Sequence, residues 1–391
     1  MLSSKIKDIT PSYTIGISSR VKELEKEGLQ IINLSIGEPD FITPTPAKEQ
    51  AINAIQANKT KYDLAAGLLE LRKAIQAKLK AENNVLYDIQ EIVVSSGAKH
   101  AITNALISLL DYGDEVIIPK PYWVSYPEMV KLVGGTPIFV DTRKENDFKI
   151  TAEEIGKAIT SKTKMIFISN PSNPTGAVYS KEELQPIIDL CLHHKIYILS
   201  DEIYEKICYS NSFTSIASIS NEAKEITVTI NGLSKSASMT GWRIGYTATN
   251  PALAKAISTV QGHLVSHPST ISQWAAVSAL THCHDEMEQM VNTYKTRRDT
   301  AVNALGEIDN ISFVYPDGAF YIFIDISSLK DNFSWEKSFS VTFSDTLLDE
   351  EKVAVVPGIA FGMDDYIRIS YACDTESLME GIRRIKKFVG R

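Results

Sequence analysis

The chain has 391 residues, of which 44% are hydrophobic and 23% are charged. This composition excludes a disordered chain, and 20 glycines are far too few for a collagen-like one. The formal net charge of −8 argues against nucleic acid or an anionic membrane as the main partner. No apolar run approaches the roughly 20 residues of a membrane span. Four scattered cysteines without a C-x-x-C pair predict reduced thiols in a cytoplasmic protein.

The first 20 residues lack the apolar core of a secretory signal. They are rich in serine and nearly free of acidic residues, which faintly resembles a transit peptide. We expect them to belong to the folded protein.

From about residue 48, short β-branched runs alternate with longer amphipathic stretches. The runs are 92–95, 115–118, 137–140, 165–169, 196–200, 226–230 and 243–247. Segments such as 99–110 and 181–194 have the helical period. This alternation predicts an α/β fold with a mostly parallel seven-stranded sheet between helices. Because ligands bind beyond the carboxyl ends of such strands, the chemistry is expected there.

The last third of the chain has a different pattern. A long polar helix is predicted over 284–306, and a closing amphipathic helix over 375–389. Three strand-like segments lie between them, at 320–326, 353–357 and 366–371, and 332–344 reads as a loop running into a helix. We predict a large domain over 46–285 and a smaller α+β domain formed by 1–45 and 286–391. The proline-rich stretch 41–46 separates the N-terminal segment from the large domain.

Polar residues follow several of the predicted strands. Gly97 follows the first, in a Ser-Gly-Ala-Lys turn that opens a helix, where free N–H groups can hold a phosphate. Taken alone, this pattern is more typical of an ordinary strand-to-helix turn. Trp123 could stack on a planar ligand or serve packing alone. Asn173 can both donate and accept hydrogen bonds. Asp201, at a buried strand end, needs a cationic or N–H partner, or caps a helix.

The segment 231–246, NGLSKSASMTGWRIGY, is the most informative. Lys235 stands among small residues directly after a predicted strand, which leaves room for a bulky group joined to its amine. Imine formation requires a lowered lysine pKa, which burial or a nearby cation supplies. Ser234 and Arg243 are donors suited to a phosphate. The segment therefore predicts a reactive lysine beside an anion site.

Over essentially its whole length the chain resembles the fold-type-I pyridoxal-5′-phosphate aminotransferases of class I and II. The wording of two motifs is similar to the bacterial and plant aspartate aminotransferase subgroup Ib. The matching motifs, in the family's order, are LSIGEPDF (34–41), KYDLAAGLLELR (61–72), SSGAKHA (95–101), PYWVSYPEM (121–129), SNPSNPTGAVY (169–179), SDEIYEKI (200–207), SKSASMTGWRIGY (234–246), DGAFYIF (317–323) and YIRISYA (366–372).

The resemblance implies pyridoxal 5′-phosphate as cofactor and a catalytic set around its ring. Lys235 would form the Schiff base and move the substrate's proton. Asp201 would bind the pyridinium nitrogen. Tyr204 would hydrogen-bond the ring 3′-oxygen, shared with Asn173, and Trp123 would stack on the ring.

The cofactor's phosphate is implied to lie between two subunits. The residues that would hold it are Gly97, Ala98, Ser234 and Arg243 from one subunit and Tyr62 from the other. The resemblance therefore implies a homodimer with active sites at the subunit interface.

The implied reaction is ping-pong transamination of an L-amino acid with a 2-oxo acid. Arg368 would grip the substrate's α-carboxylate, helped by Gly37, Asn173 and Trp123. In subgroup Ib a lysine and a threonine read a distal carboxylate, and Lys99 and Thr14 match them. This pair favours aspartate, glutamate, 2-oxoglutarate and oxaloacetate. The alternative for Thr14 is a helix N-cap, and for Lys99 a solvated charge.

Other functions stay open. Prephenate is a dicarboxylic keto acid that the same pair accommodates, so a prephenate or aromatic aminotransferase is one alternative. A carbon–sulfur lyase of this fold would use the same lysine, although the pair Lys99 and Thr14 argues against it. A non-catalytic pyridoxal-phosphate module of a transcription regulator is a further alternative, against which the charge of −8 and the lack of a basic DNA-binding segment count. The histidines at 193–194 and around Cys283 have no carboxylate at ligand spacing, so no metal is expected.

Overall fold

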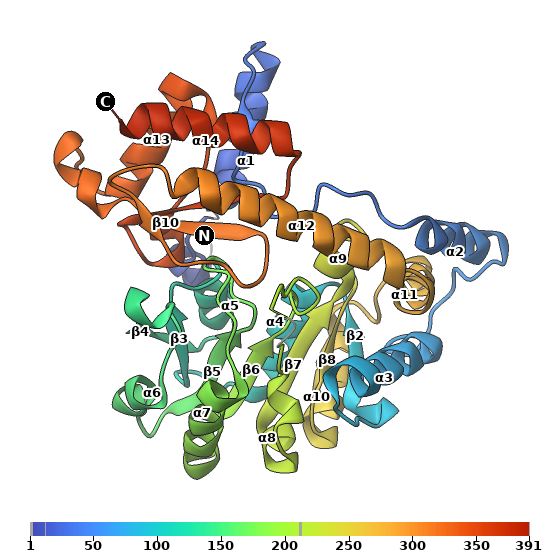
Figure 1. Ribbon diagram of the computed structural model, residues 1–391. Coiled ribbons are helices and arrows are strands. Elements are labelled where there is room, and N and C mark those ends of the chain that lie inside the picture. Colours follow the sequence, from blue (N-terminus) through green and yellow to red (C-terminus); the bar gives the residue numbers. More distant parts are fainter. Residues whose placement is uncertain (1–2, 12, 211–212, 391) are drawn as a thin grey trace.

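The computed structural model describes residues 3–11, 13–210 and 213–390, and its largest element is a seven-stranded sheet (Figure 1). Only β8 runs antiparallel to its neighbours, and the other pairs are parallel. The predicted fold class is thus confirmed, with strand ends shifted by up to two residues. The strand order is β2 (Ile92–Ser95), β8 (Gly245–Ala248), β7 (Thr227–Gly232), β6 (Tyr197–Asp201), β5 (Thr163–Ser169), β3 (Glu115–Lys120) and β4 (Thr136–Asp141).

Both faces of this sheet are buried. Along β3, Val116 and Ile118 pack into one apolar cluster and Ile117 into another, because successive side chains point to opposite faces. The helices on the first face are α4 (Ala98–Leu109), α5 (Tyr126–Leu132) and α10 (Pro251–Leu264). Those on the second are α6 (Ala152–Ala158), α7 (Lys181–His194) and α8 (Asn221–Ile226). Continuous apolar runs in the strands follow from this double burial.

A further helical group covers the β2–β8 edge of the sheet. It consists of α2 (Thr45–Gln56), α3 (Leu69–Asn83) and α11 (Thr270–His282), with the one-turn helix α9 (Leu233–Ser236) beside them. The segment of Lys235, predicted only to follow a strand, therefore begins a short helix directly after β7.

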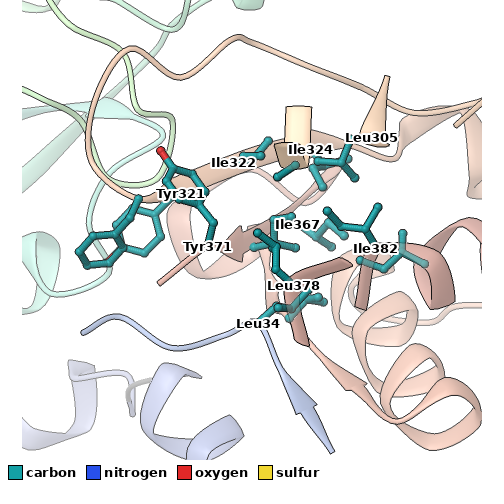
Figure 2. Close-up of a cluster of buried hydrophobic side chains, with 14 of the residues drawn as sticks. Leu34, Leu305, Tyr321, Ile322, Ile324, Ile367, Tyr371, Leu378 and Ile382 are labelled. Carbon is teal, nitrogen blue, oxygen red and sulfur yellow. The ribbon is translucent and has the colours of Figure 1, made fainter. Parts of the chain in front are cut away.

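The C-terminal third builds a second, four-stranded antiparallel sheet. Its strand order is β12 (Val356–Pro357), β13 (Tyr366–Ser370), β10 (Tyr321–Asp325) and β9 (Ser312–Phe313). The helices α13 (Phe339–Glu351) and α14 (Thr375–Val389) accompany it, and α12 (His284–Leu305) runs from the end of α11 across to this sheet (Figure 1). Figure 2 shows its apolar core, in which Leu34 meets Ile367, Leu378 and Ile382.

The segment 353–357 does not form the single strand that its apolar pattern predicts. Its first half, β11 (Val353–Ala354), pairs in parallel with β1 (Ile32–Asn33), whereas β12 joins the four-stranded sheet. The N-terminal segment is thereby joined to the C-terminal third. The helix α1 (Tyr13–Lys26) adds to this contact, because Arg20 forms ion pairs of 2.8 Å and 2.7 Å with Asp345 and Asp349.

Short 3₁₀ turns complete the described chain, at Ser4–Asp8, Ile89–Glu91, Lys144–Asn146, Ile216–Ser218, Ser327–Asn332 and Gly358–Phe361. Among the described residues, none of the helices combines the length and the apolar character needed to cross a bilayer. Nor do three or more His, Cys, Asp or Glu side chains within those ranges gather where they could hold a metal ion.

Candidate active site

Lys235 lies in α9, just past the carboxyl end of β7. The backbone at Gly232, where β7 ends, lies close to that of Ile244, because a Cβ placed on Gly232 would lie 2.7 Å from the Ile244 carbonyl oxygen. The side chain keeps partial access to solvent, and its Nζ donates a 2.6 Å hydrogen bond to the carbonyl oxygen of Gly37. The amine is thus held at the sheet edge where the fold predicts ligand chemistry.

The environment of Lys235 favours its neutral amine. Burial is the main cause, and it lowers the pKa of Lys235 to about 8. The guanidinium groups of Arg368 and Arg243 lower this pKa further, whereas the carboxylates of Glu38 and Asp201 raise it. The net effect suits an amine that must act as nucleophile or base near neutral pH.

Asp201 ends the neighbouring strand β6 and is buried. Its carboxylate accepts a 2.6 Å hydrogen bond from the hydroxyl of Tyr126 and a 3.3 Å bond from the Ile203 N–H. Burial raises the pKa of Asp201 to about 6, and these donors together with Lys235 oppose that rise. A turn follows Asp201, so the alternative interpretation as a helix N-cap is wrong.

An anion cradle lies at the start of α4, and its Arg243 acts on the pKa of Lys235. The helix begins at Ala98, one residue before the predicted segment 99–110, and Gly97 before it has a φ of +87°. A Cβ on Gly97 would lie 2.6 Å from a guanidinium nitrogen of Arg243, and one on Gly245 would lie 2.4 Å from the Ala98 nitrogen. The cradle therefore requires glycine at both positions, and it combines a helix N-terminus with a guanidinium, which fits a phosphate. Ser234, in α9 beside Lys235, is also buried.

Arg368 enters the same region from β13 of the second sheet, with only 2% of its surface exposed. It donates 3.0 Å hydrogen bonds to the Asn173 side-chain oxygen and to the Ser35 carbonyl. Its Nε finds no hydrogen-bond partner within the described residues. A buried guanidinium with a spare donor is costly unless an anion satisfies it, so this arginine fits a carboxylate ligand.

Two tyrosines lie between these groups. The hydroxyls of Tyr204 and Tyr321 are 2.8 Å apart, and both side chains are buried. The ring of Tyr321 lies under the guanidinium of Arg368, whose central carbon is 4.1 Å from the ring centroid. Tyr204 thereby connects to the arginine through one intervening side chain.

Lys99, the second residue of α4, contacts Trp123. The Lys99 Nζ lies 5.0 Å from the centroid of the Trp123 ring, and that ring stands edge-on to Tyr126 at 5.3 Å. Burial, and then the charge of Arg243, lowers the pKa of Lys99. Lys99 is nevertheless exposed, so the alternative interpretation as a solvated helix charge stays open.

Two expected site residues lie farther out. Thr14 is the second residue of α1, where its carbonyl accepts a hydrogen bond from Ser18, so it lies inside the helix rather than before it. Tyr62 belongs to the loop between α2 and α3, is 90% exposed and touches the ring of His267 edge-on. Its exposure is what a residue that reaches another subunit requires.

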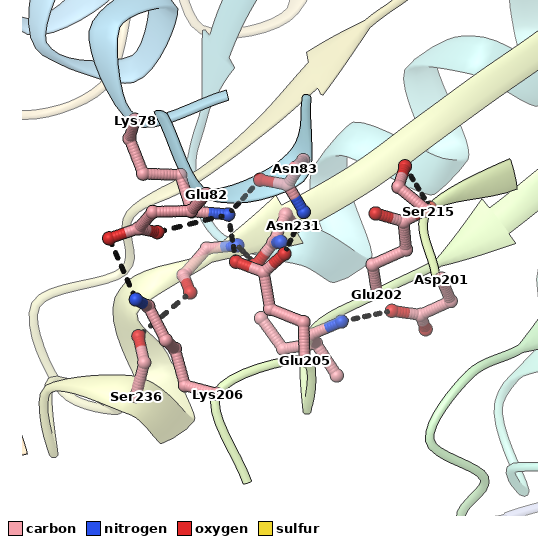
Figure 3. Close-up of polar contacts among 12 residues, drawn as sticks. Lys78, Glu82, Asn83, Asp201, Glu202, Glu205, Lys206, Ser215, Asn231 and Ser236 are labelled. Carbon is pink, nitrogen blue, oxygen red and sulfur yellow. Dashed lines mark hydrogen bonds and ion pairs between the residues drawn. The ribbon is translucent and has the colours of Figure 1, made fainter. Parts of the chain in front are cut away.

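A buried polar network supports the turn that follows Asp201 (Figure 3). Lys78 of α3 donates to Glu205 and, at 2.6 Å, to Asn83, which itself donates to Glu205 at 2.6 Å. Glu202 accepts from two serine hydroxyls at 2.8 Å and 2.9 Å, and burial raises its pKa to about 8. The network ties α3 to the turn, so the positions of Asp201 and the residues after it are fixed from behind.

Comparison with known proteins places this arrangement in a class. The family model of the class I and II aminotransferases matches residues 30–385, so the chain belongs to that family. The family predicted from the motifs, and the enzyme class, are thus confirmed.

Individual relatives match over nearly the full length. The chain is 46% identical to a "probable aspartate/prephenate aminotransferase" of Aquifex aeolicus, covering 99% of this chain and 98% of the relative. It is 44% identical to an aspartate aminotransferase of Bacillus subtilis, with the same coverage. Among solved structures, an aspartate aminotransferase from Rhizobium meliloti superimposes with a TM-score of 0.95 at 39% identity, covering 100% of this chain and 99% of that one. The Thermus thermophilus aspartate aminotransferase with maleate gives 0.93 at 38% identity, covering 99% of each.

Three residues at the site could not be identified from the sequence. Tyr126 stands three positions after Trp123 in a motif that matches the family, but nothing local shows that its hydroxyl meets Asp201. Tyr321 reads as one of several aromatic residues in a buried strand. Glu38 reads as a surface charge, and its effect on the pKa of Lys235 arises only because the N-terminal segment crosses the site.

Proposed function

We propose that the protein is a pyridoxal-phosphate-dependent transaminase that exchanges the amino group of L-aspartate or L-glutamate with 2-oxoglutarate or oxaloacetate. The observation that carries the proposal is Lys235, a lysine of lowered pKa on which both the Asp201 carboxylate and Arg243 of the Gly97–Arg243 cradle act. The names of the relatives support the substrate class.

The residues present fit this cofactor, which supplies a carbonyl group for the lysine and an electron-withdrawing ring. Asp201, fixed by Tyr126 and ionised above pH about 6, would hold the ring nitrogen protonated. Tyr204 would donate to the ring oxygen, and Trp123 would cover one ring face. The phosphate would be held by Gly97, Ala98, Ser234 and Arg243.

Lys235 would act as the base that takes the proton from the substrate Cα and returns it to the cofactor's former carbonyl carbon. Arg368 would hold the α-carboxylate, because its buried fork has a donor to spare and Asn173 fixes its orientation. The Gly37 backbone lies within reach of the same place, since its carbonyl contacts Lys235. Two successive half-reactions with different 2-oxo acids make the kinetics ping-pong.

Dicarboxylate preference would come from Lys99 and Thr14. Lys99 stands over Trp123 at the site mouth, where a partly desolvated ammonium attracts a carboxylate more strongly than in water. Maleate, a dicarboxylate, appears with the Thermus relative. In the proposed division into a large domain, 46–285, and a small one, 1–45 with 286–391, Arg368 and Lys235 would belong to different domains.

A homodimer is part of the proposal. Large exposed apolar side chains occur before and along α2, in the loop to α3, at the start of α3 and at the end of α10, and exposed apolar surface is typical of an interface. They are Ile42, Ile52, Ile55, Tyr62, Leu64, Leu69, Leu264 and Val265. Tyr62, within this set, would then reach the partner's phosphate.

The four cysteines are free, which supports a cytoplasmic location.

The test is a coupled assay of the purified protein with aspartate and 2-oxoglutarate, together with its visible absorbance. We expect turnover and a cofactor band, both lost in Lys235→Ala and retained in Lys181→Ala, a matched change on the exposed start of α7. Absence of the band, or full activity in Lys235→Ala, refutes the proposal. Release of pyruvate from cystathionine without any oxo acid indicates the lyase instead.

Prephenate is the second candidate acceptor, because the Aquifex relative is named for it. The same assay with prephenate and aspartate decides it. Turnover comparable to that with 2-oxoglutarate adds this activity, and none removes it.

A further inference from the structure

Tyr321 is a buried residue at the centre of the site to which transamination chemistry gives no task. We propose that Tyr321 is a positioning residue that joins substrate recognition to cofactor binding: its hydroxyl orients Tyr204, and its ring supports Arg368. This inference rests on the proposed function and deepens it.

The position of Tyr321 is tightly defined. It begins β10 and is 1% exposed, packed among the apolar side chains of the four-stranded sheet (Figure 2). Its hydroxyl lies 2.8 Å from that of Tyr204. A Cβ on Gly37 would lie 3.5 Å from the same oxygen, so the hydroxyl faces the Gly37 backbone that Lys235 also contacts. The side chain therefore leaves the core of one sheet and ends at the site above the other.

The hydroxyl pair has one productive direction of donation. Each phenol carries a single hydroxyl proton. In the proposed site, Tyr204 donates its proton to the cofactor's ring oxygen. Tyr321 must then donate to Tyr204, and hydrogen bonds in such a chain strengthen one another. Arg368 lies close to both phenols, and its positive charge acts on them. This charge favours electron-rich oxygens at both positions, and it disfavours a positively charged residue in place of Tyr321.

The ring of Tyr321 has a separate role. Arg368 lies between two aromatic rings, with its central carbon 4.1 Å from the centroid of Tyr321 and 5.1 Å from that of Phe361. Stacking of this kind fixes the plane of a guanidinium and suits it better than an ammonium. The hydrogen bonds to Asn173 and Ser35 then set the rotation within that plane.

Tyr321→Phe isolates the hydroxyl. Without that donor, Tyr204 becomes a weaker donor to the cofactor's ring oxygen. The nitrogen that joins Lys235 to the cofactor then holds its proton more tightly, so the pH midpoint of the bound cofactor's absorbance rises. We expect a rise of about 0.5 pH unit, and maleate affinity within about twofold of wild type because the ring stays. Tyr371→Phe is the matched control: its buried hydroxyl donates to the Ala319 carbonyl at 3.0 Å, so its loss leaves the midpoint unchanged.

Two further variants complete the test. Tyr321→Leu also removes the ring, and we expect maleate to bind at least about tenfold more weakly, equivalent to roughly 1.4 kcal/mol. In a Tyr204→Phe background, Tyr321→Phe should no longer move the midpoint, because the hydroxyl it acts through is gone.

The outcomes separate the two proposals. No cofactor band in the wild type refutes the proposed function itself. A normal band with the Tyr321→Phe midpoint equal to wild type overturns the role of the hydroxyl, as does a shift that persists in the Tyr204→Phe background. Unchanged maleate affinity in Tyr321→Leu overturns the role of the ring.

Discussion

The lowered pKa of Lys235 gives a direct test of the site in the cofactor-free protein. A fall from the ordinary 10.5 to about 8 raises the fraction of neutral amine at pH 7 by about 300-fold, because each pH unit is a factor of ten. Lys235 is partly exposed, so a small reagent can reach it. Trace acetylation between pH 6 and 10, with mass spectrometry of the Lys235 peptide against added Nα-acetyl-lysine, measures the midpoint.

The variant Glu38→Gln tests the cause as well as the value. The Glu38 carboxylate raises the pKa of Lys235, so its neutralisation lowers the midpoint below that of the wild type. Glu38 is exposed and bonded to the Thr240 hydroxyl at 2.9 Å, so this change leaves the core intact. A wild-type midpoint at or above 10, or an upward shift in Glu38→Gln, refutes the reasoning.

Three further outcomes are expected. Burial raises the pKa of Glu202 to about 8, well above the ordinary 4.5. Its contribution to stability is therefore full below pH 4.5 and is lost as pH rises through 8. In urea unfolding at pH 5, 7 and 9, Glu202→Gln should remove roughly 4 kcal/mol of this pH dependence. Parallel curves for variant and wild type would contradict that. Lys99→Ala should raise the KM for aspartate at least about tenfold, and that for a neutral amino acid far less; equal effects on both would remove Lys99 from substrate recognition. Gly97→Ala places a methyl group against Arg243 at a positive φ, and equilibrium binding should show cofactor affinity weakened by about tenfold or more with the fold retained, whereas wild-type affinity would disprove the cradle.

Much of the fold could be predicted because local pattern and burial agree. The continuous apolar runs end within two residues of the observed strands, and α7 and α14 begin and end at the predicted residues. The segment 353–357 shows the limit. Its five residues have the pattern of one strand. In the structure, however, the first two pair with the strand of Asn33 and the last two with the strand of Arg368, which belong to different sheets. Pairing partners are distant in sequence, so the pattern carries no information about that division.

The candidate site divides in the same way. The chemistry-bearing residues that stand at strand ends, Lys235, Asp201 and Asn173, could be found from the sequence, because parallel strands bring their carboxyl ends to one edge. Their partners could not, because Tyr126, Tyr321 and Glu38 look like ordinary aromatic and charged residues until folding brings them together.

The opening composition pointed to an acidic chain with little affinity for anions. The sequence by itself determined the sheet, the lysine segment and the family to which they belong, because these depend on local pattern and on motifs in order. Only the tertiary structure decided the electrostatics: it brings Arg243 and Arg368, 125 positions apart, close enough to Lys235 for both charges to lower its pKa. Burial at that point magnifies their charge, so a net charge of −8 surrounds a site built for anions.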